Sequence, residues 1–292
     1  MNNYRNQTAF LLIAAVMVFA AGCPQQRYEP IVLAAAQGET AKVRALLAQG
    51  ANINVMDRGF TPLLVALQRG QIETARMLIE AGADVKVVDE QCGFSALAFA
   101  AFEGDTEICK MLIDRGADLE STNRLCAPFG SMGGETPLII AAIKNRVEVV
   151  RMLIDSGAKI NAKNNLDRTA IMEASFYGNT GVVEVLIRAG ADVNGLDVNR
   201  GTPLIFATVK NHTKTMEALI TAGADLNTTD NEGFTALIIA VIKGHKEAAK
   251  LLIDRGADLN VRASDGNTAL SIAKQKQNNE LVKMLTAAGA TE

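Results

Sequence analysis

A dipeptide that recurs at a nearly constant interval constrains this 292-residue chain more than any other feature. Gly-Ala marks eight successive segments, at intervals of 32, 34, 41, 33, 33, 33 and 33 residues, beginning at Gly50, Gly82, Gly116, Gly157, Gly190, Gly223, Gly256 and Gly289. Such a period is typical of stacked repeats, in which each unit buries its apolar face only against its neighbours. The spacing therefore predicts a repeat array in place of one large globular core.

A second marker keeps step with the first and begins the units. It is Thr-Pro-Leu or a close variant, and it starts at Thr61, Ser95, Thr136, Thr169, Thr202, Thr235 and Thr268. Thr at an N-cap followed by Pro at N1 predicts a helix start, and Gly82 suits the left-handed residue that follows a helix. Between them, Gly70 separates two apolar stripes of helical period, and residues 84–89 suit a β-turn. Each unit is thus predicted to be a helix–turn–helix followed by a β-turn finger.

The period, the Thr-Pro-Leu start and the Gly-Ala-Asp-x-Asn end resemble ankyrin repeats over residues 30–292. The resemblance implies an all-α ankyrin-repeat solenoid of about eight repeats, whose activity is the recognition of other proteins. The family's His after Thr-Pro-Leu is absent from every repeat, and residues such as Leu64 and Ile205 replace it. We expect repeats at about 30–56, 57–88, 89–122, 123–163, 164–196, 197–229, 230–262 and 263–292, with polar residues 274–279 at the outer edge of the last one.

Composition narrows the classes of function. Only 4% of the residues are aromatic and none is Trp, which suits thin layers of Ala, Leu, Ile and Val. A formal net charge of −3 argues against a mainly electrostatic nucleic-acid binder. The chain has two His and four Cys, and it contains no H-E-x-x-H, G-x-S-x-G or C-x-x-C motif. We therefore expect no catalytic residues, no metal and no cofactor.

Residues 1–22 predict an export signal. Residues 9–21 form a run of 13 small or apolar residues, shorter than the ~20 that a membrane-spanning helix needs. Ala20-Ala21-Gly22-Cys23 resembles the lipobox of bacterial lipoproteins, which implies cleavage before Cys23 and its acylation. Residues 23–29 would be a short tether, the lipid the only membrane contact, and Pro24 favours the outer membrane. Ordinary secretion, with Cys23 as a free thiol, is the alternative.

The other three cysteines fall into two kinds of position. Cys109 occupies an apolar position of a second helix, where it reads as a small buried side chain. Cys92 and Cys126 lie in consecutive fingers, the two whose spacing exceeds 33 residues. Because disulfides persist in exported proteins, we predict a bridge between them, with two unrelated thiols as the alternative. The insertion 123–134 contains three glycines but lacks the Lys of a phosphate-binding loop, which predicts a flexible finger.

Glu173 stands in an otherwise apolar column and is the strongest candidate for chemistry. A buried carboxylate can be a catalytic acid, yet no base or metal ligand accompanies it, so we favour a hydrogen bond to neighbouring backbone or Asn. His212 and His245 are 33 residues apart at equivalent turns. Stacked repeats would hold them about 10 Å apart, too far to share one zinc ion. We interpret both histidines as turn residues.

Two columns at the ends of the first helices predict a partner surface. The first is large and apolar in the central repeats, and the second is mostly basic. The candidate contacts are Phe102, Ile143, Phe176, Val209 and Ile242 from the first column, and Tyr177, Lys210 and Lys243 from the second. In the family this side faces the concave groove, and an apolar stripe bordered by Lys suits a partner with an apolar centre and an acidic rim. Packing of the apolar column against the second helices is the alternative.

Together these features predict a monomeric, non-catalytic scaffold that is lipid-anchored at the periplasmic face of a bacterial envelope and binds another protein, not nucleic acid. A dedicated inhibitor or immunity protein for an exported enzyme or toxin is one alternative. An enzyme that depends on Glu173 is another.

Overall fold

The computed structural model describes residues 28–126 and 132–291, so the predicted signal peptide, Cys23 and most of the tether lie outside the described residues. Within them the chain forms sixteen helices in consecutive pairs, which confirms the predicted all-α repeat architecture. In chain order the helices are α1 (Pro30–Ala36), α2 (Thr40–Ala48), α3 (Pro62–Gln68), α4 (Ile72–Glu80), α5 (Ala96–Glu103), α6 (Thr106–Asp114), α7 (Pro137–Ile143), α8 (Val147–Asp155), α9 (Ala170–Tyr177), α10 (Thr180–Arg188), α11 (Pro203–Val209), α12 (Thr213–Thr221), α13 (Ala236–Lys243), α14 (Lys246–Asp254), α15 (Ala269–Gln275) and α16 (Asn279–Ala287).

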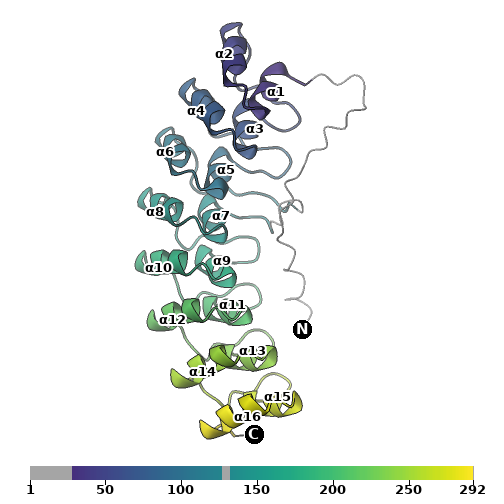
Figure 1. The fold of residues 1–292 in the computed structure, drawn as a ribbon, viewed down its shortest axis with the longest axis vertical. Coiled ribbons are helices and arrows are strands. Elements are labelled where there is room, and N and C mark those ends of the chain that lie inside the picture. The colour runs from purple at the N-terminus through teal and green to yellow at the C-terminus, as the bar shows by residue number, and fades with distance from the viewer. Residues whose placement is uncertain (1–27, 127–131, 292) are drawn as a thin grey trace. The chain divides into compact units, whose positions relative to one another are not determined.

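The chain divides into two compact units, and each is described by itself. Unit 1 comprises the described residues up to Ile140 with Asp155–Ala158, and unit 2 comprises Ala141–Ile154 with Lys159 onward. In unit 1, α1, α3 and α5 pack side by side, and α2, α4 and α6 form a second layer (Figure 1). Unit 2 repeats this arrangement with α9, α11, α13 and α15 in one layer and α10, α12, α14 and α16 in the other.

Local residue chemistry explains where the first helices begin. The Thr61 Oγ1 accepts a hydrogen bond from the Leu64 N–H at 3.3 Å, and Pro62 occupies the first helical position. Thr202 and Thr235 cap α11 and α13 in the same way. After α4, Gly82 has φ 88°, a left-handed conformation that a residue with a Cβ avoids. The predicted helix boundaries therefore follow from capping and from glycine.

A column of alanines explains how closely the first helices pack. The fifth residue after each cap position is Ala in every repeat, and each of these side chains is at most 1% exposed: Ala34, Ala66, Ala100, Ala141, Ala174, Ala207, Ala240 and Ala273. A methyl side chain lets the backbones of neighbouring helices approach. The core is therefore a thin seam along each unit, which accounts for the low aromatic content.

The Asn of the Gly-Ala-Asp-x-Asn end connects one repeat to the next. In unit 1, Asn54 Oδ1 accepts the N–H of Asp84 at 2.9 Å. In unit 2, the N–H groups of Asp192, Asp225, Asp258 and Thr291 donate at 2.7–3.0 Å to Asn161, Asn194, Asn227 and Asn260. These bonds join residues that are 30 or 31 positions apart, so the motif acts between repeats as well as within one.

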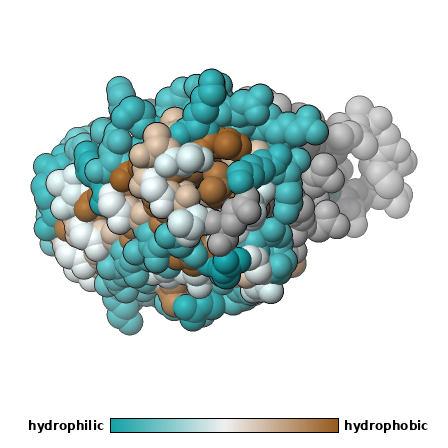
Figure 2. All heavy atoms as spheres, turned by 90° about the horizontal axis from the view of Figure 1, so that it is seen from below, coloured by the Kyte–Doolittle hydropathy of each residue, from teal (hydrophilic) through white to brown (hydrophobic). Residues whose placement is uncertain are grey.

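The last repeat carries the polar edge expected of a terminal unit. Residues 274–277 and Asn279 are exposed, and the half-buried Asn278 caps α16 by accepting the N–H of Leu281 at 3.2 Å. Figure 2 looks onto this end and shows hydrophilic residues around a smaller apolar area. The edge keeps the terminal layer compatible with water.

Candidate functional site

The predicted contact residues differ in exposure. In unit 1, Phe102 at the end of α5 is half-buried. In unit 2, Ile143, Tyr177, Lys210 and Ile242 are half-buried and Lys243 is exposed. Phe176 and Val209 are buried, at 4% and 9% exposure. For these last two residues the structure supports the packing interpretation, and the expected surface position of Phe176 is corrected.

Phe176 is buried because Phe206 of the neighbouring helix α11 packs against it, together with Met172 and Tyr177 of its own helix. It clusters with Met172 and Phe206, and the ring centroids of Phe176 and Phe206 are 6.2 Å apart at 80°. Tyr177 packs edge-on against Phe176 at 5.1 Å, and the Lys210 Nζ lies 4.7 Å from the Phe176 ring centroid. Such edge-to-face and cation–π contacts are favourable arrangements. Tyr177 and Lys210 are therefore the more exposed members of an ordered group.

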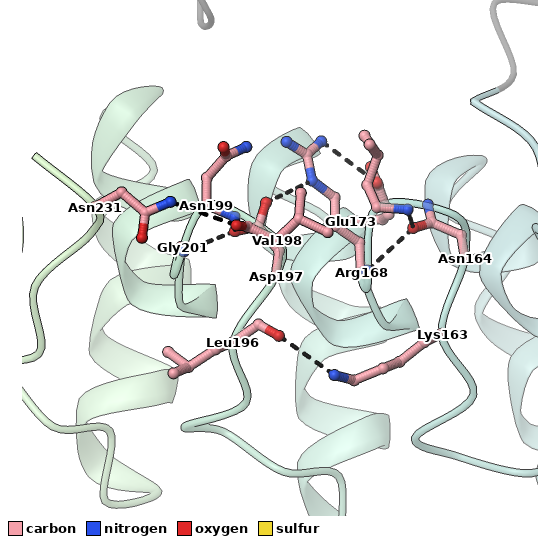
Figure 3. A network of polar contacts seen from close by, with 11 residues as sticks. Lys163, Asn164, Arg168, Glu173, Leu196, Asp197, Val198, Asn199, Gly201 and Asn231 are labelled. Atoms are coloured by element: carbon pink, nitrogen blue, oxygen red, sulfur yellow. Dashed lines mark hydrogen bonds and ion pairs between the residues drawn. The ribbon is translucent and has the colours of Figure 1, made fainter.

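A buried charged cluster lies beside this group in unit 2 (Figure 3). The Arg168 Nε donates to the Asp197 Oδ2 at 3.2 Å, and its Nη1 lies 3.6 Å from the Glu173 Oε1. The side chains of Arg168, Glu173 and Asp197 are 6%, 7% and 1% exposed. We expected Glu173 to bond to backbone or Asn, but its ionic partner is Arg168. The guanidinium carbon also lies 4.5 Å from the centroid of the Phe206 ring.

The local sequence explains why this cluster fits. Asp197 Oδ1 accepts the N–H groups of Asn199 at 2.9 Å and Gly201 at 2.7 Å, which shapes the finger before α11. A Cβ on Gly201 would stand 3.0 Å from the Phe206 Cζ and 3.1 Å from Asp197 Oδ1, so only glycine leaves this space free. Arg168 then ties the finger to the preceding repeat. Because Arg168 contacts both carboxylates and all three side chains are buried, the cluster orders the finger.

Sequence reasoning missed Arg168 and Asp197. Arg168 stands immediately before the cap Thr169, where other repeats have Phe60, Phe94 or Phe234. A charged residue at an aromatic position, five residues from the unusual Glu173, was a signal for an ion pair. Asp197 was harder to find because it comes from the next finger, 29 residues away.

The two histidines connect successive repeats through their rings. His245 Nε2 lies 3.3 Å from the Val209 carbonyl oxygen. Burial lowers the pKa of His212, the charge of Lys210 lowers it further, and a hydrogen bond with the Phe176 carbonyl opposes both effects. The equivalent Asn179 donates to the carbonyl groups of residues 142 and 143 at 2.8 and 3.1 Å. In the part of the chain that the structure describes, no group of three His, Cys, Asp or Glu is placed to hold a metal ion.

The finger cysteines lie in unit 1. Cys92 and Cys126 form a disulfide with Cα atoms 5.4 Å apart, and the Arg124 N–H donates to the Cys92 carbonyl at 2.7 Å. Cys109 is a buried free thiol, and burial, followed by the charge of Asp105, raises its pKa to about 12. Residues 127–131 of the predicted flexible finger lie outside the described residues, as does Cys23.

Comparison with known proteins places the sequence in context. A family profile described as ankyrin repeats in three copies matches residues 2–89, 86–164, 158–230 and 223–291. No curated protein gives a sequence match. Across residues 28–126 and 132–291, no helix has the length and apolar character needed to span a bilayer.

Proposed function

Because the chain belongs to the ankyrin-repeat family, we propose that it is a scaffold that binds a partner protein at the ends of its first helices, on the concave side and fingers. Ankyrin repeats are protein-interaction modules and are typically non-catalytic. The observation that carries the proposal is the grouping in unit 2 of Tyr177, Lys210, Ile242 and Lys243, half-buried or exposed side chains on adjacent helices. An apolar and aromatic centre with a charged rim is the usual composition of a protein interface.

The chemistry of this group indicates the kind of partner. Lys210 and Lys243 have no ion pair with a carboxylate among the described residues. A partner with an apolar patch and an acidic rim would complement them. Two other half-buried residues share the repeat position of Ile242. In unit 1 it is occupied by the ring of Phe102, and at the start of unit 2 by the aliphatic side chain of Ile143.

Site-specific crosslinking in the producing cells tests the proposal. A photoreactive phenylalanine replaces Tyr177 in one variant and the exposed Lys250 of α14 in a matched control. We expect protein adducts at position 177 that Ile242→Asp abolishes, and no such adducts at position 250. Equal adducts at both positions would refute the proposed surface. One abundant adduct would favour the dedicated inhibitor or immunity protein, and a mixture would favour a general scaffold.

The proposed location is the periplasmic face of a bacterial outer membrane, with the chain held by a lipid on Cys23. The support is the lipobox-like Ala20-Ala21-Gly22-Cys23 after a 13-residue apolar run. Cys23→Ser is expected to move the protein from the membrane fraction to the soluble fraction and to abolish labelling by an alkyne-tagged fatty acid. A wild-type protein that is unlabelled and already soluble would contradict the anchor.

The enzyme alternative depends on Glu173, which contacts Arg168 and is 7% exposed. A carboxylate held in this way is poorly placed to reach a substrate. Glu173→Gln is therefore expected to leave crosslinking at position 177 intact, whereas an activity lost on this change would support catalysis.

A further inference from the structure

Several cations of unit 2 are paired with carboxylates, and most of these pairs lie on the second helices. Among the cations of the second-helix layer, Arg188 pairs with Glu184, Lys246 with Glu280, Lys250 with Asp254, and Arg255 with Glu217, whereas Lys214 and Lys283 make no ion pair within the described residues. The carboxylates compensate the charge of the four paired cations, so each of them is less available to an acidic partner.

At the ends of the first helices, lysines recur at one position of the repeat. Lys210, Lys243 and Lys276 occupy the same position in three successive repeats, 33 residues apart, and Tyr177 holds that position in the repeat before. Within the described residues, none of the three lysines makes an ion pair. Lys243 and Lys276 are exposed, and Lys210 is half-buried with its ammonium over the Phe176 ring. We call Tyr177, Lys210, Lys243 and Lys276 the lysine column.

The neighbouring positions add no negative charge to the lysine column. The residues that follow it are Gly178, Asn211, Gly244 and Gln277, and those that precede it are Phe176, Val209, Ile242 and Gln275. Because α9, α11, α13 and α15 pack side by side, the column advances by one helix spacing per repeat, about 10 Å. It presents cations at a regular spacing along one edge of unit 2.

That spacing matches an extended polypeptide. In the extended polyproline-II conformation the chain rises about 3.1 Å per residue with three residues per turn, so every third side chain lies on the same face, about 9 Å from the last. A helix could also match, with an acid at every seventh residue, but helix recognition needs an open apolar groove. Here Phe176 and Val209, which would line such a groove, are 4% and 9% exposed. The exposed chemistry of this edge is therefore mainly cationic.

We propose that the partner's recognition element is an extended acidic segment, with a carboxylate at every third residue, that lies along the lysine column. This inference rests on the proposed function and specifies the partner class for the same surface. Three carboxylates of the partner segment, each three residues after the last, would face Lys210, Lys243 and Lys276. The partner residue that faces Tyr177 need not be acidic. Exposed ion pairs contribute modestly, about 1.4- to 5-fold in affinity each, so the three together supply roughly 3- to 150-fold.

Binding of synthetic peptides to the full mature chain tests the proposal. The probe is a fluorescent 12-residue peptide of Asp, Ser and Thr with Asp at every third position, and its isomers carry the same Asp residues contiguously or at every second position. A helical peptide with Asp at every seventh residue represents the other geometry. We expect the period-three peptide to bind most tightly, with affinity that falls as salt rises.

Two double variants separate the lysine column from general charge. Lys210→Gln with Lys243→Gln is expected to weaken the period-three peptide roughly 2- to 30-fold, whereas Lys246→Gln with Lys250→Gln, which removes the same charge from the second helices, leaves it unchanged. Circular dichroism checks that both variants are folded.

Several results would overturn the inference. They are equal binding of all isomers, tightest binding of the helical peptide, equal losses in both double variants, or tighter binding of single-stranded DNA than of the peptide. If the peptides fail while position 177 still crosslinks to a protein, the inference is wrong and the proposed function stands. If position 177 captures no protein, the proposed function fails whatever the peptides do.

Discussion

Removal of the Arg168 guanidinium is expected to destabilise the middle of unit 2 more than any other single change at the charged cluster. In Arg168→Met, the carboxylates of Glu173 and Asp197 remain in place at 7% and 1% exposure without their shared cation. Removing one member of a buried ion pair costs about 3–5 kcal/mol, because the remaining charge stays buried and uncompensated. This corresponds to a roughly 100- to 4,000-fold rise in the local unfolding equilibrium.

The matched variant is Glu173→Ile, which removes a charge from the same cluster with the opposite expected outcome. It leaves a neutral pair of Arg168 and Asp197, and it gives the fifth repeat the aliphatic side chain found at Ile140 and Ile239. We expect its free energy of unfolding to stay within about 1 kcal/mol of the wild-type value. The prediction is therefore that Arg168→Met is strongly destabilised while Glu173→Ile is close to the wild-type protein in stability.

Amide hydrogen exchange followed by mass spectrometry is the suitable assay. Repeat arrays unfold in parts, so a single unfolding midpoint does not report one site, and without Trp the chain has no indole signal. In Arg168→Met, peptides from α9 and α11 should lose protection while those from α3 to α6 keep it. Equal protection of α9 and α11 in the two variants, within a factor of two, would refute the reasoning.

Three further predictions concern other parts of the fold. Cys92→Ser should lower the free energy of unfolding of unit 1 by about 4 kcal/mol, because the bond to Cys126 closes a loop of 34 residues. In urea titrations the variant should unfold at the same midpoint as the reduced wild-type protein, and a midpoint equal to that of the oxidised wild-type protein would contradict the prediction. Burial raises the pKa of Asp230, so its contribution to stability is full below pH 3.8 and is lost as pH rises through the raised pKa. Asp230→Asn, which mimics the equivalent Asn164, should therefore be at least as stable at pH 7, with an advantage that shrinks toward pH 3.8 in pH-dependent urea titrations. Cys109, with its pKa near 12, should resist iodoacetamide at pH 8 in the native protein and react after denaturation, as peptide mapping would show; fast native alkylation would contradict its burial.

The sequence could predict the parts of this fold that depend on local chemistry. A cap such as Thr61 and a left-handed Gly82 act within a few residues, and their recurrence at 33 residues predicts the stack. The contact between Arg168 and Asp197 depends instead on how two successive fingers align, which no local rule specifies. The burial of Phe176 likewise depends on Phe206, which comes from the next helix.

The charged cluster and the lysine column are physically connected. The Arg168 guanidinium lies over the Phe206 ring, and Phe206 packs edge-on against Phe176. The Lys210 ammonium in turn lies over the Phe176 ring. Each of these contacts positions the next residue, so the buried Arg168 and the two phenylalanine rings hold Lys210 in place. The cluster is therefore more than a local substitute for an aliphatic core residue. If it positions the binding surface, Arg168→Met should weaken the acidic peptide even where Lys210 is intact, whereas Glu173→Ile should not, because it keeps Arg168 bonded to Asp197 and over Phe206.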